Sequence, residues 1–416
     1  MNWEEYNLGQ LVSLKQGFAL NKKSQHHLSG DNSGLPLLKI SDLINGTETL
    51  FVKTTIPEQF LVTPSEIIYS RTGQVGLAFM GKTGVVYNNC FKVIPNEKLD
   101  SVFIFHWLNS KQIRDYIKSL ATGAAQPDLN HDAFKSVKIN LPPLPTQKRI
   151  ASILSAYDDL IENNLKRIKL LEETAQNIYK EWFVHFRFPN YEHTAFDEES
   201  GLPVGWEIKK LSHFIDFHIG GGWGNEQQES EFTDSAYVIR GTDMPDIKLG
   251  MFTKIPFRFH KSSNLKSRKI EPNDIVFEVS GGSAKYPVGR SILLNSKILE
   301  NFGNESVMCA SFCKLIRPKN EIIPSIFLSM FLDNIYFDGT LAQYENRSAS
   351  NIVNFKFETF LEKQEVCIPP KELLNEFEKI ATPIFDLKTT LGIEISKLKE
   401  ARDILLPRLM NRTIEV

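Results

Sequence analysis

The longest regular pattern of apolar and polar positions in this chain is helical, and it occurs twice. After residue 153, apolar side chains recur at alternating steps of three and four residues, which is the spacing of a coiled-coil seam. A less regular version follows residue 380, because Leu387 and Leu406 compete for the same face. The predicted seam positions are Leu154, Tyr157, Ile161, Asn164, Ile168, Leu171, Ala175, Ile178 and Trp182 in the first helix, and Ala381, Ile384, Lys388, Leu391, Ile395, Leu398, Arg402, Leu405 and Leu409 in the second.

Each predicted helix is too long to pack only on the domain that precedes it. Roughly 35 to 40 residues give about 55 to 60 Å of helix, whereas a domain of roughly 140 residues has a radius of gyration of about 14 Å. In the alternative, each apolar stripe packs on its own domain, as most amphipathic helices do. We expect instead that the two helices pair antiparallel as a spacer, in which the polar seam member Asn164 fixes the register.

Short strand-like segments precede each helix, and they also occur twice in the same order. Each copy ends at a double proline, Pro142-Pro143 or Pro369-Pro370, and from there the two halves align without gaps at an offset of 227. Since paired prolines neither continue a helix nor fit a central strand, they mark the end of a globular domain. The matched segments are 3–11 with 205–211, 37–43 with 238–244, 64–69 with 272–277, and 90–97 with 312–319, in which Cys90 is aligned with Phe312.

These patterns predict an α+β fold, with two pseudo-symmetric mixed α/β domains separated by two long helices that form an antiparallel coiled coil. The segment between the first helix and the second domain is polar, acidic and interrupted by proline and glycine, as linkers are. The predicted boundaries are 1–145 for the first globular domain, 146–188 for the first spacer helix, 189–204 for the linker, 205–370 for the second globular domain and 371–416 for the second spacer helix.

The composition is that of a globular protein with more than one domain. The chain has 416 residues, of which 42% are hydrophobic and 24% charged. Apolar runs are all shorter than a membrane span, and the N-terminus lacks the pattern of a signal peptide. The four cysteines are scattered without a CxxC pair. We therefore expect a cytoplasmic protein with reduced thiols.

The formal net charge of −2 is low for a nucleic-acid-binding protein, so such a function needs a local excess of cations. The segment 248–269 provides one, since it contains seven Lys and Arg residues and neither Asp nor Glu. It is either a surface that binds phosphates or a solvated basic loop.

One segment matches the sequence pattern of a catalytic motif but lacks the structural context that the motif needs. Residues 76–83, GLAFMGKT, fit the P-loop pattern GxxxxGK[ST]. A P-loop needs a helix directly after the motif, so that its N-terminus can hold phosphates. Residues 84–89 read as extended chain, and the corresponding segment of the second copy, 288–293, lacks the pattern. The sequence therefore argues against nucleotide binding.

Other catalytic patterns are also incomplete. Residues 272–280 contain acidic residues like those of a metal-dependent nuclease, but Ser280 stands where a lysine is needed. Residues 140–144 lack the spacing and the aromatic side chain of an adenine methyltransferase. The His26-His27 pair has no nearby residues that complete a metal site. The sequence therefore predicts no catalytic or metal-binding site.

The duplicated arrangement of domain and helix resembles the specificity subunits of type I restriction-modification systems over the whole chain. The helical segments carry the most specific similarity: residues 141–151 and 179–184 are similar to the start and end of the family's first conserved region. Residues 201–206 are similar to the start of its second target recognition domain, and residues 401–410 to its C-terminal signature. Residues 70–73 and 122–126 also resemble segments that recur in the family, whereas 278–281 and 346–350 of the second copy depart from them.

This resemblance implies a sequence-specific DNA-binding subunit that is not itself an enzyme. Two target recognition domains would read the two halves of an asymmetric bipartite target in double-stranded DNA, much as dimer geometry sets half-site spacing elsewhere. The implied partners are two methyltransferase subunits, which methylate adenine, and restriction/translocase subunits. S-adenosylmethionine, ATP and Mg are expected on those partners, and no cofactor is expected on this chain.

The candidate DNA contacts follow from side-chain chemistry. Arg and Lys bridge phosphates or pair with guanine, and Gln, Asn and Thr read other base edges. Each of them can instead be a solvated surface group. The candidates are Lys39, Arg71, Gln74, Lys82, Gln126 and Asn130 in the first domain, Arg240, Thr242, Arg290 and Arg347 in the second, and Lys261, Lys266, Arg268 and Lys269 as residues that bind phosphates.

Two other hypotheses stay open. The chain could be the specificity subunit of a system that only methylates, or of one whose nuclease and methylase are fused. Alternatively, it could be a protein-binding scaffold that does not contact DNA, which the near-neutral charge favours and the family-like helical segments oppose.

Overall fold

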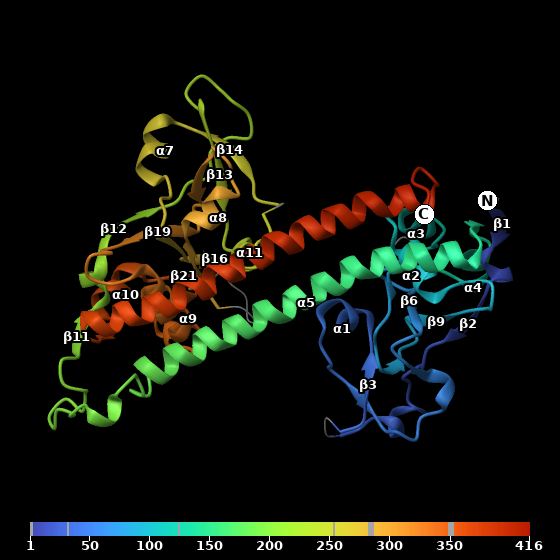
Figure 1. Cartoon of the computed structure of the whole chain (residues 1–416), viewed down its shortest axis with the longest axis horizontal. Helices are drawn as coiled ribbons and strands as arrows, with labels where there is room; N and C mark the ends of the chain where they lie inside the picture. The colour runs from blue at the N-terminus through green and yellow to red at the C-terminus, as the bar shows by residue number, and fades with distance from the viewer. Residues whose placement is uncertain (1–2, 31–32, 124, 253, 282–286, 348–352) are drawn as a thin grey trace. The chain divides into compact units, whose positions relative to one another are not determined.

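The computed structural model describes residues 3–30, 33–123, 125–252, 254–281, 287–347 and 353–416 (Figure 1). The chain divides into two compact units: Met1–Leu160 with Leu398–Val416 form the first, and Ile161–Lys397 form the second. Each unit therefore contains one globular domain and a segment of both long helices.

The first unit contains two four-stranded sheets, in the strand orders β2-β9-β6-β7 and β4-β3-β8-β5. The central strand β6 is buried along its whole length, including its polar last residue Ser70, whose hydroxyl accepts from the amide of Leu77 at 2.8 Å. The strands are β1 (Glu4–Asn7), β2 (Val12–Gln16), β3 (Leu35–Leu38), β4 (Phe51–Val52), β5 (Leu61–Val62), β6 (Ile67–Ser70), β7 (Ala78–Phe79), β8 (Gly84–Val86), β9 (Cys90–Pro95) and β10 (Lys138–Leu141). The helices are α1 (Ile40–Asn45), α2 (Ser101–Asn109), α3 (Lys111–Ser119) and α4 (His131–Lys135).

The second unit repeats this plan with additions. Its main sheet has the order β12-β19-β15-β17, and a second sheet has the order β14-β13-β18. The strands are β11 (Glu207–Lys210), β12 (Ile215–Gly220), β13 (Asp234–Ile239), β14 (Phe257–His260), β15 (Asp274–Glu278), β16 (Ser280–Gly281), β17 (Ser291–Leu294), β18 (Ser306–Cys309), β19 (Cys313–Pro318), β20 (Glu345–Arg347), β21 (Val353–Phe355) and β22 (Glu365–Ile368). The helices are α6 (Met244–Lys248), α7 (Ser262–Arg268), α8 (Ser296–Glu300), α9 (Ser325–Phe337) and α10 (Phe357–Lys363).

The predicted duplication is confirmed strand by strand. In both units a parallel pair, β3 with β8 or β13 with β18, carries an antiparallel neighbour, β4 or β14. In both units the first strand pairs with the last, as β1 with β10 and β11 with β22. The two domains therefore share these strand pairings, and the second domain has a further three-stranded sheet in the order β16-β21-β20.

The sequence alignment of one repeated strand is wrong by one residue. The strands β6 and β15 correspond, and Ile67 pairs with Val93 where Ile275 pairs with Ile316. Val93 thus corresponds to Ile316, and Cys90 corresponds to Cys313 instead of Phe312. The shared lysine in each segment favoured the shifted alignment, but a shift of one residue would place every side chain on the opposite face of the sheet.

The two long helices are α5 (Leu144–Phe183) and α11 (Lys371–Met410), and each has 40 residues. The residue numbers at which the two helices start differ by 227, and so do those at which they end. The gapless alignment predicted from the prolines is therefore confirmed. Within the second unit Asn164 donates to Glu394 at 3.1 Å and Lys388 to Glu172 at 3.1 Å. Since rising numbers on α5 meet falling numbers on α11, the predicted antiparallel pairing is confirmed (Figure 1).

The polar seam residues Asn164, Lys388 and Arg402 each contact the opposite helix. The contacts of Asn164 and Lys388 lie within the second unit, and Arg402 donates to Asp158 at 2.6 Å within the first unit. Of the two competing leucines, Leu406 is buried and Leu387 is exposed. The other seam positions are buried at Leu154, Ile161, Ile168, Ala175, Ala381, Leu391, Ile395 and Leu409, and half-buried at Tyr157, Leu171, Ile178, Trp182, Ile384, Leu398 and Leu405.

Both helices also complete the cores of the globular domains. The start of α5, with Ile150 and Leu154, and the end of α11, with Leu409, pack in the core of the first unit around Phe103 and Phe134. The end of α5 and the start of α11 pack in the core of the second unit, through Ala175, Tyr179, Phe183, Leu374 and Phe377. The helices therefore pair with each other and also anchor each domain.

Candidate nucleic-acid interface

In the first unit, Arg71 lies at the centre of a hydrogen-bonded cluster at the end of β6. Its guanidinium donates to both carboxylate oxygens of Asp128, at 3.2 and 2.5 Å, and to Oε1 of Gln16 at 3.0 Å. The hydroxyl of Thr72 donates to Asp128 at 2.5 Å. These bonds from Arg71 and Thr72 hold the pKa of the Asp128 carboxyl below its usual value.

This cluster fixes two loops that carry candidate base-reading residues. The amide of Gly73 donates to the carbonyl of Pro127 at 2.8 Å, so the chain after β6 lies beside the chain that leads into α4. Gln74 and Gln126 are exposed on these two loops. Asn130 is also exposed, and its side chain accepts from the amide of Ala133 as the N-cap of α4. Arg71 therefore helps to hold the two loops together, and its role as a DNA contact stays a prediction, as do those of the exposed Gln74 and Gln126.

The other members of the cluster could not be found from the sequence. Gln16, Asp128 and His131 are brought together by the fold, with His131 Nε2 3.1 Å from Gln16 Oε1. Gln16 lies 55 residues from Arg71, Asp128 lies 57 residues away, and no local motif connects them. Burial, with a smaller contribution from the charge of Arg71, lowers the pKa of His131.

Replacing Asp128 tests whether this ion pair holds the two loops. We expect Asp128→Asn to lower the free energy of unfolding of the first unit by about 1 to 2 kcal/mol, because the pair is partly exposed. The wild-type stability from this carboxylate is present above the unfolded pKa and is lost as pH falls through the lowered folded pKa. Urea unfolding at pH 7 and at pH 3, which lies below the unfolded pKa of about 3.9, should show a smaller pH effect in the variant. The exposed Asp132→Asn is the control, and equal behaviour of the two variants would contradict the role of Asp128.

Lys39 and Lys82 occupy different settings in the first unit. Lys39 Nζ lies 3.5 Å from Asp42 at the start of α1. Lys82 is half-buried in the turn between β7 and β8. Because strand β8 follows the P-loop-like residues directly, no helix N-terminus is available there to hold a phosphate. The prediction that extended chain follows the motif is confirmed.

In the second unit, two predicted contact residues are tied to carboxylates. Arg240 donates to both oxygens of Asp243, at 2.9 and 2.7 Å, and this bonding raises the pKa of Arg240. Arg290 donates to both oxygens of the buried Glu278, at 2.9 and 2.6 Å. Thr242 is exposed beside the Arg240 pair. The side chain of Arg347 lies outside the described residues.

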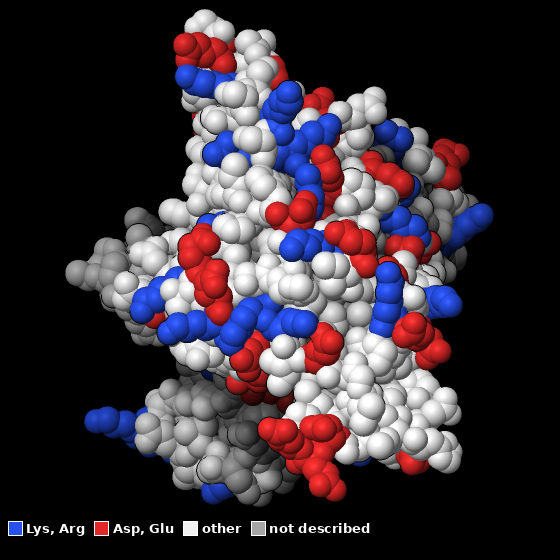
Figure 2. Space-filling view, turned by 90° about the vertical axis from the view of Figure 1, so that its left-hand side faces the viewer, with Lys and Arg blue, Asp and Glu red and all other residues white. Residues whose placement is uncertain are grey.

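The basic segment 248–269 is partly neutralised within the second unit. Lys248 pairs with Asp333 at 2.9 Å, Arg258 with Glu226 at 2.9 Å, and Lys261 with Glu231. Arg268 donates to the carbonyl of Gly220 at 2.9 Å. On the face drawn in Figure 2, Lys and Arg side chains are interspersed with Asp and Glu. Lys266 and Lys269 are exposed, and their role as phosphate contacts stays a prediction.

Comparison with known proteins shows to which family the chain belongs. The family model described as the type I restriction modification DNA specificity domain matches residues 1–173. The specificity subunit of the type I restriction enzyme MjaIX of Methanocaldococcus jannaschii is 24% identical over 98% of this chain and 93% of its own length. A Mycoplasma pneumoniae chain described as the C-terminus of a type I specificity subunit is 32% identical, and 86% of it is covered. The chain belongs to the type I restriction-modification specificity subunit family.

The fold of this specificity subunit agrees with a solved relative. The type I S subunit from M. genitalium has a TM-score of 0.62 at 15% identity, over 99% of this chain and 96% of that chain. Within the described residues, no helix is long and apolar enough to cross a membrane, and no group of three His, Cys, Asp or Glu side chains is arranged to hold a metal ion.

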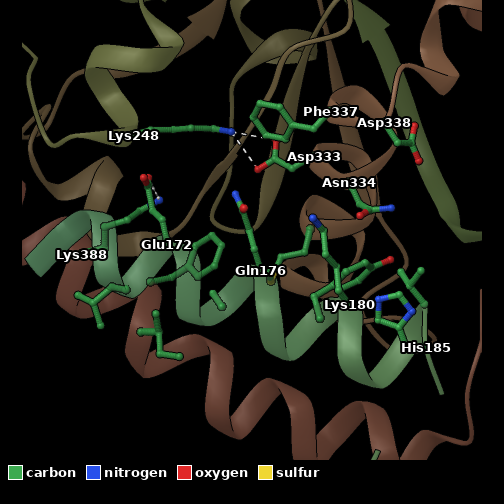
Figure 3. Close-up of a pocket in the computed structure, with 17 residues that line it drawn as sticks. Glu172, Gln176, Lys180, His185, Lys248, Asp333, Asn334, Phe337, Asp338 and Lys388 are labelled. Carbon is green, nitrogen blue, oxygen red and sulfur yellow. Dashed lines mark hydrogen bonds and ion pairs between the residues drawn. The ribbon is translucent and has the colours of Figure 1, made fainter. Parts of the chain in front are cut away.

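Each unit of the specificity subunit has a cavity beside the helix pair. In the second unit, a cavity of about 490 Å³ lies between α5, α9 and α11, and Figure 3 shows the ion pairs of Lys248 with Asp333 and of Lys388 with Glu172 at one end of it. In the first unit, a cavity of about 1150 Å³ is lined by α2, α3, β10, α5 and α11. The helices α2 and α9 correspond in the repeat, so the two cavities occupy corresponding places in their units.

Proposed function

We propose that this specificity subunit recognises an asymmetric bipartite DNA target and directs adenine methylation and restriction by partner subunits. The observation that carries the proposal is that the two domains share a topology but have different polar groups where corresponding strands end. Where β6 ends, Arg71 binds Asp128, and where the corresponding β15 ends, Glu278 binds Arg290. Two similar scaffolds with different polar edges are suited to reading two different half-sites.

In this proposal, residues 1–145 and 205–370 are the target recognition domains, and residues 146–188 and 371–416 are the spacer helices that set the distance between half-sites. Residues 189–204 connect the first helix to the second domain. Rigid spacing of two reading modules defines an unread gap, as the spacing of dimer half-sites does in other DNA-binding proteins. Lys266 and Lys269 would contact phosphates, so their loss would weaken binding to all sequences alike.

The methyltransferase partners would dock on the helix pair. Leu160 of α5 is 51% exposed and Leu387 of α11 is 40% exposed, although leucine is normally buried. The two residues differ by 227, so they occupy the same position of the repeat. A repeated apolar position supports two copies of one partner, one for each helix. S-adenosylmethionine would be bound by those subunits, and ATP and Mg by restriction/translocase subunits.

The decisive experiment is mapping of modified bases by long-read sequencing. DNA is taken from cells that carry the cognate methyltransferase gene, with and without the gene for this chain. We expect an asymmetric motif of two short halves, with adenine methylated in both, only when this chain is present. An unchanged pattern of methylation, although the two proteins are soluble and associated, would contradict the proposal and favour the scaffold hypothesis.

A further inference from the structure

A glycine-rich loop of the second unit displays a tryptophan on the surface. Trp223 follows β12 and is 40% exposed, although a side chain of this size is usually largely buried. The amides before it are fixed, since Gly221 donates to the carbonyl of Cys313 and Gly222 to that of Cys309, both at 2.9 Å. The exposure of the ring therefore occurs in a loop whose backbone is held on the sheet.

Glycine is required on both sides of Trp223, because other backbone atoms lie too close to leave room for a Cβ. A Cβ at residue 221 would lie 2.2 Å from the carbonyl oxygen of Ala310. Gly224 has a φ of +70°, and a Cβ there would lie 2.4 Å from the carbonyl oxygen of Phe259. Asn225 then exchanges two 2.9 Å backbone hydrogen bonds with Phe259. The chain is thus fixed before and after the tryptophan.

The ring of Trp223 also has a cationic neighbour. The guanidinium carbon of Arg258 lies 5.0 Å from the ring centroid, and Glu226 holds that guanidinium at 2.9 Å. Arg268 donates to Gly220 at the start of the loop. Both arginines come from the segment 248–269, so the fold joins the basic segment to the glycine-rich loop.

The net charge of the residues around this loop favours binding of a polyanion. Acidic residues are present in the loop, but those at 226 and 231 are engaged by Arg258 and Lys261. Residues 220–234 and 254–269 together contain six Lys and Arg against four Asp and Glu. The first unit differs at the same place: Gly17 takes the position of Gly221 against the carbonyl of Tyr87, and Phe18 after it is buried.

We propose that Trp223 stacks on a base of the half-site read by the second unit, with Arg258 orienting the ring and the neighbouring cations contacting phosphates. An exposed, fixed aromatic ring beside an arginine suits a nucleobase whose flat face is uncovered. In a duplex such a face is available where a base step is opened or a base is extruded, as methyltransferases do to their target base. This inference rests on the proposed function, and it assigns the contact to one half-site only, because the first unit has Ala19, without a ring, at the position that corresponds to Trp223.

The test uses the complex of the full chain with its methyltransferase subunits and a duplex that carries the target found by base mapping. We expect Trp223→Ala to weaken binding by roughly 5- to 150-fold, as loss of one aromatic–base stack does, and Trp223→Phe to retain most of the affinity. Phe337→Ala is the control, because Phe337 is an exposed aromatic residue of the same unit on α9. The thermal unfolding midpoints of all three variants should match the wild type.

An abasic scan of the target identifies the stacked base. In the wild type, removing one particular base of one half-site should weaken binding, and in Trp223→Ala the same removal should have little further effect. If the wild-type complex binds and Trp223→Ala binds within twofold of it, this inference is wrong while the proposed function stands. If the wild-type complex itself does not select its target, the proposed function has failed instead.

Discussion

Replacing Gly392 by alanine should destabilise the second unit, although alanine is the better helix former. In an exposed helix, the change from glycine to alanine stabilises by about 1 kcal/mol. Here a Cβ at residue 392 would lie 2.2 Å from the carbonyl oxygen of Leu249 and 2.7 Å from the Cα of Gly250. Because these are backbone atoms, they cannot rotate away. We expect the free energy of unfolding to fall by about 2 to 3 kcal/mol, which reverses the sign given by helix propensity.

The contact involves two glycines that share one space. Gly250 has a φ of +71°, and a Cβ there would lie 2.5 Å from the carbonyl carbon of Gly392. Ser396 donates to the carbonyl of Gly250 at 3.1 Å. The turn after α6 is therefore seated directly on the backbone of α11, and this is one of the points at which the second domain is attached to its helix.

Urea unfolding and hydrogen exchange of the amides of residues 388–396 measure the effect. The control is Leu165→Ala, at the position of α5 that corresponds to Gly392, where the side chain is exposed. It should change the stability by less than about 1 kcal/mol. The double variant with Gly250→Ala should cost clearly less than the sum of the two single changes, because either one opens the same contact. Additive effects, or a stabilised Gly392→Ala, would show that the contact does not hold the domain.

The sequence predicted the parts of the fold that depend on periodicity. Both 40-residue helices begin and end at the predicted offset because their seams repeat every three and four residues and because double prolines mark their starts. The shift by one residue between β9 and β19 shows the limit of this reasoning. Short strands contain few residues, and a shared lysine outweighed the alternation that sets the register.

The site was less predictable than the fold because its contacts join distant residues. Arg71 was a candidate from its residue type, but its partners Gln16 and Asp128 are more than fifty residues away in sequence. The structure changes the interpretation of such arginines, since a guanidinium that is bonded to a carboxylate holds a loop in place before it can contact DNA. Trp223 was not among the candidate DNA contacts, because its exposure could not be read from the sequence.

Removing Glu172 should destabilise the second unit more than removing its partner Lys388. The side chain of Lys388 is 11% exposed, and burial lowers its pKa while Glu172 opposes that shift. Glu172 is 38% exposed, so it can be hydrated without a partner. We expect Glu172→Gln to lower the free energy of unfolding by about 1 to 3 kcal/mol, because it leaves a buried ammonium without its carboxylate.

Lys388→Met should change the stability by less than about 1 kcal/mol, since it replaces the buried charge with an apolar side chain of similar length. The repeat supports this expectation, because the corresponding residue of α5 is Ile161, which is buried in the same seam pattern. The pair thus fixes the register of the helices and contributes little net stability. If Lys388→Met were the more damaging change, the attraction between the charges would outweigh the cost of burying the ammonium.

The pH dependence provides an independent check on Glu172→Gln. Without the carboxylate, the folded-state pKa of Lys388 falls further, while the unfolded value stays at about 10.4. Between these two values the unfolded chain binds the extra proton, so the stability of the variant rises with pH. The deficit relative to wild type should therefore be largest near pH 7 and should shrink toward pH 10 in urea unfolding followed by tryptophan fluorescence. A deficit that is constant over this range would mean that Glu172 stabilises the helix pair by packing and not by its charge.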